Sequence, residues 1–136
     1  TEGIVLEHTS FLHHEYGHQL NYLFADVFPQ KEMTAVSGQY KGFTERQNLN
    51  YKDLWKLGYT SNYAMCSVHE DFAEFCEALY LQPVALFMAI RDNPPLAAKF
   101  AVVRPFLEMV KRRTTGDAAP MDAAYFARFD RAVWRP

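Results

Sequence analysis

The sequence predicts a mainly α-helical domain with little or no β-sheet. Residues 9–28 and 67–81 each place apolar side chains on one side of a helix and ionisable side chains on the other. Prolines and glycines separate these two segments from further stretches with helical patterning. Strand signals are weak, and only residues 3–6 resemble a short strand.

Length and charge narrow the class of protein. The chain has 136 residues, so we expect residues 1–136 to form a single domain. It opens at Thr1 rather than at a methionine, so we expect it to be the C-terminal part of a longer protein. The net charge of −2 argues against a nucleic-acid partner, because such proteins need a basic surface. We also expect no transmembrane segment, because no apolar run approaches the roughly 18 residues that a span needs.

The first predicted helix spans residues 9–28. Thr9 or Ser10 can cap its N-terminus, and Pro29 stops it. His14 and His18 lie together on one face of this helix. The opposite face is apolar and carries Leu12, Tyr16, Leu20, Leu23 and Val27.

Residues 29–61 are more polar and read mostly as a loop. Within them, residues 51–57 form a plausible short helix, with Asn50 as its N-cap and Gly58 as its C-terminal stop. Loops of this length inside a compact domain are often functional.

The second strong helix spans residues 67–81. Ser67 and Glu70 form the Ser-x-x-Glu pattern of a capping box, and Pro83 closes the helix. One face of this helix is acidic, and the opposite face is apolar. The acidic face holds Glu70, Ala73, Glu74 and Glu77, and the apolar face holds Phe72, Phe75, Cys76 and Leu79.

The remaining chain is helical by pattern. We expect helices over residues 83–91 and 95–113, with Pro105 kinking or splitting the second of them. A last amphipathic helix is expected over residues 121–132.

The motif His14-Glu15-Tyr16-Gly17-His18 has the pattern H-E-x-x-H on a helix. Histidines four residues apart lie one turn apart on the same face, so both imidazoles can reach one metal ion. Zinc favours such nitrogen ligands. The glutamate after the first histidine lies further round the helix, where it can reach a water activated by the metal. The alternative is a solvated helix face with incidental histidines.

A catalytic zinc site needs a third protein ligand, and Glu70 is the candidate. Glu74 lies one turn later on the same face, where it can accept a hydrogen bond from a ligand histidine and hold its ring in place. Two alternatives stay open: the two glutamates could be surface carboxylates, or His69 could be the third ligand.

The segments HHEYGH and SNYAMCSVHEDFAEF together resemble the Glu-zincin metallopeptidases. The resemblance covers residues 9–82 and points to lethal-factor-like peptidases and to zinc-binding metallopeptidase lipoproteins of gut bacteria. It implies a zincin-like catalytic domain that uses Zn²⁺ to hydrolyse a peptide or protein substrate, in a secreted or cell-surface location. The implied zinc ligands are His14, His18 and Glu70, and the implied catalytic base is Glu15. Glu74 would hold His14, and Tyr63 would assist the tetrahedral intermediate.

Two other classes of function stay open. The chain could be a peptide- or glycan-binding module that keeps the metal site without catalysis. It could also hold a structural metal, closed by a fourth ligand such as His69 or Asp71. Tyr63 could equally be a buried aromatic side chain. Nothing in the sequence indicates an oligomeric state.

Overall fold

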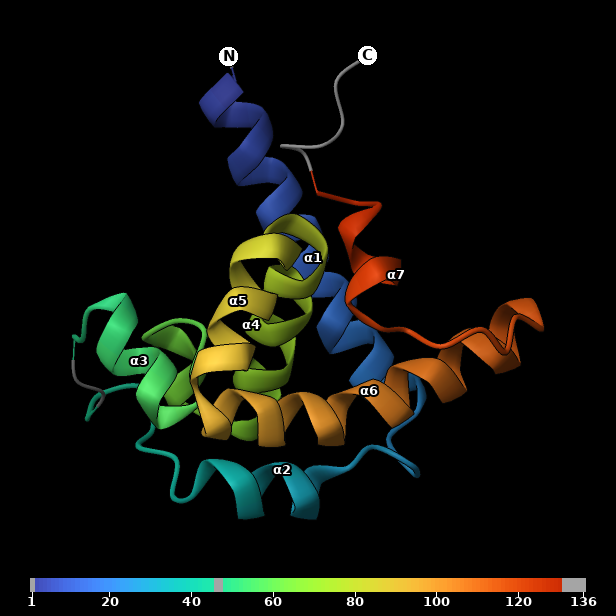
Figure 1. Cartoon of the computed structure of the whole chain (residues 1–136). Helices are drawn as coiled ribbons and strands as arrows, with labels where there is room; N and C mark the ends of the chain where they lie inside the picture. Colours follow the sequence, from blue (N-terminus) through green and yellow to red (C-terminus); the bar gives the residue numbers. More distant parts are fainter. Residues whose placement is uncertain (1, 46–47, 131–136) are drawn as a thin grey trace.

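The computed structural model describes residues 2–45 and 48–130, with side chains from Leu12 onward. The described part is helical and contains no β-strand, which confirms the predicted fold class. Its elements are α1 (Glu2–Leu23), α2 (Gln30–Ser37), α3 (Tyr51–Leu57), the 3-10 helix η1 (Tyr63–Met65), α4 (Val68–Leu81), α5 (Pro83–Asp92), α6 (Pro94–Thr115) and α7 (Ala123–Ala127). In Figure 1, α4 and α5 lie centrally, α1 runs beside α4, and α6 crosses below with α2 on its far side.

Helix α1 differs from the prediction at both ends. It begins at Glu2, so the expected strand over residues 3–6 and the expected cap at Thr9 or Ser10 are wrong. A short apolar run does not by itself distinguish a strand from a helix, and a lone strand is unstable without a partner. The helix ends at Leu23, and the chain continues to Val27 in turns, with the Val27 amide donating to the Phe24 carbonyl at 3.0 Å.

Helix α1 packs against α4 mainly through the side that carries His14 and Gly17, and of the predicted apolar side only Leu20 is buried. Leu12 and Tyr16 are 66% and 55% exposed, whereas Leu20 is 6% exposed and belongs to the core. Gly17 lies directly against Ala73 of α4, at a distance that leaves no room for a side chain. The apolar pattern of α1 therefore predicts the helix correctly but does not identify the face that is buried.

Helix α4 is the centre of the core. Phe72, Phe75 and Leu79 are fully buried along it. Ser67 caps it as predicted, with its hydroxyl oxygen accepting a hydrogen bond from the Glu70 amide at 3.2 Å. This cap places Glu70 in the first turn of α4, on the side that faces α1.

The other helices complete the core. Helix α3 has the predicted bounds, with the Asn50 side chain accepting from the Asp53 amide at 3.0 Å. Helix α6 is continuous from Pro94 to Thr115, so Pro105 does not split it; Phe106 and Leu107 beside this proline are buried and hold the helix against its neighbours. Helix α7 ends at Ala127, which is earlier than predicted, and residues 131–132 of the predicted helix lie outside the described residues.

Among the helices described, none is long and apolar enough to cross a membrane by itself. Helices α4 and α5 meet that test of length and composition only when they are taken together, and they are bent by 116° at their junction.

Candidate metal centre

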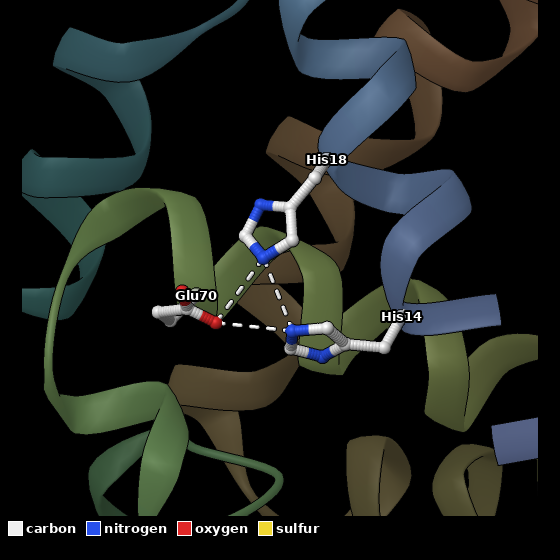
Figure 2. A group of neighbouring side chains, drawn as sticks. All are labelled: His14, His18 and Glu70. Carbon is white, nitrogen blue, oxygen red and sulfur yellow. Dashed lines mark hydrogen bonds and ion pairs between the residues drawn. The ribbon is translucent and has the colours of Figure 1, made fainter. Parts of the chain in front are cut away.

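Helices α1 and α4 direct three metal-binding atoms toward one point (Figure 2). His14 Nε2 lies 3.1 Å from Glu70 Oε2, and His18 Nε2 lies 3.3 Å from the same oxygen. The two Nε2 atoms lie 3.1 Å apart. The structure therefore brings together two histidines one turn apart on α1 and a glutamate from a distant part of the chain.

The three atoms fit a zinc ion. Tetrahedral zinc with ligand bonds of about 2.0–2.1 Å holds its ligand atoms about 3.3–3.4 Å from one another. The observed separations of 3.1–3.3 Å match one face of such a tetrahedron. Within the described part of the chain, no fourth His, Cys, Asp or Glu joins this group. Three protein ligands with one open position are typical of catalytic rather than structural zinc sites.

Glu74 supports His14 from behind. Its Oε1 lies 2.9 Å from His14 Nδ1, whereas the nearest oxygen of Glu77 lies 3.9 Å from that nitrogen. A hydrogen bond from Nδ1–H to Glu74 leaves the lone pair on Nε2, which is the atom that faces His18 and Glu70. Such a contact would hold the ring in the tautomer that can bind a metal.

Tyr63 lies beside His14, and Glu15 is exposed on α1. Glu15 follows His14 on α1, and its side chain is exposed to solvent. Tyr63 lies in η1 and is 36% exposed, with its ring centroid 6.1 Å from that of His14. Phe43 also lies near Tyr63, at 5.7 Å between ring centroids. Tyr63 is therefore a side chain at the rim of the centre rather than a buried core residue.

The alternative ligands lie elsewhere. His69 accepts a hydrogen bond from Asn21 at Nδ1 and stacks on Phe28, with 6.0 Å between ring centroids. Asp71 is buried against Lys99. Neither belongs to the group of His14, His18 and Glu70, so the structure does not support a site closed by four protein ligands.

Cys76 does not belong to this group. It is buried where α4 meets α1 beside Gly17, and burial raises the pKa of its thiol. The thiolate form that a metal requires is therefore disfavoured.

Gly17 is a site residue that the sequence analysis does not single out. A Cβ atom at this position would lie 2.9 Å from the Cα of Ala73, so only glycine permits this approach of α1 to α4. A glycine inside a helix costs about 1 kcal/mol of helix stability relative to alanine. A glycine between His14 and His18 is therefore a sequence signal that another part of the chain packs closely there.

The fold and the centre are those of a helical, zincin-like domain, with a group that could hold a metal ion on two facing helices. A family model described as "Putative zinc-binding metallo-peptidase" matches residues 4–107, which include most of α1, all of α4 and every residue of the centre. The chain belongs to this family of zinc-binding metallopeptidases. No curated protein and no solved structure matches the sequence.

Proposed function

We propose that the protein is a zinc-dependent peptidase of the Glu-zincin type, with zinc held by His14, His18 and Glu70. The observation that carries this proposal is the spacing of 3.1–3.3 Å among the three ligand atoms. The hydrogen bond between His14 and Glu74 adds to it, because such bonds accompany ligand histidines in zinc sites.

Each residue of the centre has a role in this proposal. When bound, zinc supplies a Lewis acid that makes water more acidic and polarises a carbonyl group. Glu15 takes a proton from the attacking water and passes it to the leaving amine as the C–N bond breaks. The Tyr63 hydroxyl donates a hydrogen bond to the carbonyl oxygen as negative charge develops on it. Glu74 holds the His14 ring in its binding tautomer throughout.

The proposed substrate is a peptide or protein, and the proposed location is outside the cell or at its surface. Both rest on the family resemblance. Secretion is tested by separating cells from medium and envelope and detecting the chain in each fraction; detection in the cytoplasm alone would contradict it.

The direct test combines metal analysis with digestion. Purified protein is expected to contain about one zinc per chain and to cleave members of a peptide library. A chelator should abolish cleavage, and added zinc should restore it. Cleavage that persists after zinc has been removed would contradict the proposal. Zinc binding with peptide or glycan binding but no cleavage would support the non-catalytic module instead.

A further inference from the structure

A buried ion pair lies one residue along α4 from Glu70. Lys99 of α6 and Asp71 of α4 both have fully buried side chains, and Lys99 Nζ lies 2.9 Å from Asp71 Oδ1 and 2.8 Å from Oδ2. Asp71 is the residue after Glu70, so the pair joins α6 to the same helical turn that carries the proposed zinc ligand.

The lysine ammonium group has further partners from the end of α3. It donates a hydrogen bond to the Gly58 carbonyl and lies over the Tyr59 ring, 4.3 Å from its centroid. Burial raises the pKa of Tyr59 to about 12, so its hydroxyl stays protonated and donates to the Ser37 carbonyl at 3.1 Å. Lys99 therefore contacts α4 and the chain after α3 at the same time.

The aspartate carboxylate is held equally closely. Asp71 Oδ2 accepts hydrogen bonds from Tyr40 OH at 2.7 Å and from Ser37 Oγ at 3.0 Å. Those two residues lie at the end of α2 and in the segment after it. The pair is thus a single buried junction between α4, α6, the end of α2 and the chain after α3.

A buried ion pair of this kind is a poor source of stability. Removing both charges from water is costly, and apolar side chains of similar volume often stabilise a core as well or better. The pair instead restricts the rotation of α4, because the Asp71 carboxylate can contact Lys99, Tyr40 and Ser37 in only one orientation of this helix.

The rotation of α4 about its own axis matters because it determines where the Glu70 carboxylate lies. Atoms at the edge of a helix lie about 6 Å from its axis, so a rotation of about 20° moves them by about 2 Å, as much as a zinc–ligand bond. Asp71 lies about 100° from Glu70 around the helix, so a clamp on Asp71 also sets the direction of Glu70.

We propose that Lys99 is a positioning residue for the metal centre. By holding Asp71 against α6, it sets the rotation of α4 and so brings the Glu70 carboxylate to the two histidines. The inference rests on the proposed zinc site, and it adds that zinc binding depends on a buried ion pair outside that site.

The test replaces the pair with neutral side chains of similar size, in the double variant Lys99→Met with Asp71→Asn. The control is Val103→Ala, which weakens the core one turn further along α6 without touching the pair. Thermal unfolding, zinc affinity by competition with a coloured chelator, and the visible spectrum of the Co²⁺-loaded protein are measured for each.

The double variant is expected to fold, to bind zinc at least about tenfold more weakly than the native chain, and to show an altered Co²⁺ spectrum. Val103→Ala should lower the melting temperature and leave zinc affinity and spectrum unchanged. A double variant with native affinity and spectrum would overturn the proposal, since the pair would then act on stability alone. Native protein that binds no zinc would overturn the proposed function as well.

If the double variant does not fold, Tyr40→Phe decides the question. It removes one hydrogen bond to Asp71 and keeps the ring. A smaller loss of zinc affinity with a shifted Co²⁺ spectrum is expected, and native values for both would overturn the proposal.

Discussion

Gly17 of α1 lies against Ala73 of α4 so closely that a methyl group on the glycine would lie 2.9 Å from the alanine Cα. The contact occurs between His14 and His18 on one helix and beside Glu70 and Glu74 on the other. The distance between the two helices at this crossing therefore sets the distance between the proposed zinc ligands.

The first prediction is that Gly17→Ala separates the helices and weakens the centre. Alanine favours the helix by about 1 kcal/mol, but overpacking typically costs about 1–3 kcal/mol, and here the obstructing atom is backbone. We expect lower stability in urea and a zinc affinity reduced by about tenfold or more. Gln19→Ala, at an exposed position of the same helix, is the matched control. Native zinc affinity in Gly17→Ala would show that the crossing distance does not control the site.

The second prediction concerns Glu15. Glu15→Gln keeps the size of the side chain but removes its basicity, so zinc content should be native while kcat falls by about 10²–10⁴-fold. Metal analysis and digestion of a cleaved peptide check the two parts. Cleavage at the native rate would refute the role of Glu15 as the base.

The third prediction separates Glu74 from Glu77. Glu74→Ala removes the acceptor 2.9 Å from His14 Nδ1 and should weaken zinc binding by about 10–100-fold. Glu77→Ala is the control, because its carboxylate lies 3.9 Å from the same nitrogen, and it should change zinc affinity little. Equal effects of the two variants in a zinc titration would mean that general negative charge, rather than the hydrogen bond, supports His14.

The fourth prediction tests how much of the predicted apolar side of α1 is buried. Leu20→Ala should cost about 2–5 kcal/mol of unfolding free energy, because Leu20 belongs to the core. Leu12→Gln should change it by no more than about 0.5 kcal/mol, because Leu12 is 66% exposed. Chemical denaturation of both variants measures this. A large loss in Leu12→Gln would show that this face is covered in the native protein.

The fifth prediction uses Cys76 to report on the helix crossing. Burial raises the pKa of its thiol, so little thiolate forms near pH 8 and alkylation should be slow until the protein unfolds. Labelling with iodoacetamide followed by mass spectrometry gives the rate at Cys76. Gly17→Ala should accelerate it, since Gly17 lies beside Cys76 as well as Ala73. Rapid labelling of the native chain would contradict the packing of α1 on α4.

Local patterning was sufficient for much of the fold and for the composition of the candidate site. The caps at Asn50 and Ser67 act within a few residues of themselves, so their sequence signals identify the starts of α3 and α4 correctly. The spacing of His14 and His18 is equally local, because helix geometry alone places them on one face. Such features depend only on residues close together in the sequence, so the sequence is sufficient to predict them.

Contacts between residues far apart in the sequence could be identified only from the folded structure. Periodicity showed that α1 has an apolar and a polar face, but the choice of the face with His14 and Gly17 depends on the shape of α4. The same is true of Lys99 and Asp71, whose side chains meet only when the chain folds and brings α6 to α4. A sequence pattern records which groups can interact, whereas packing between helices determines which of them do.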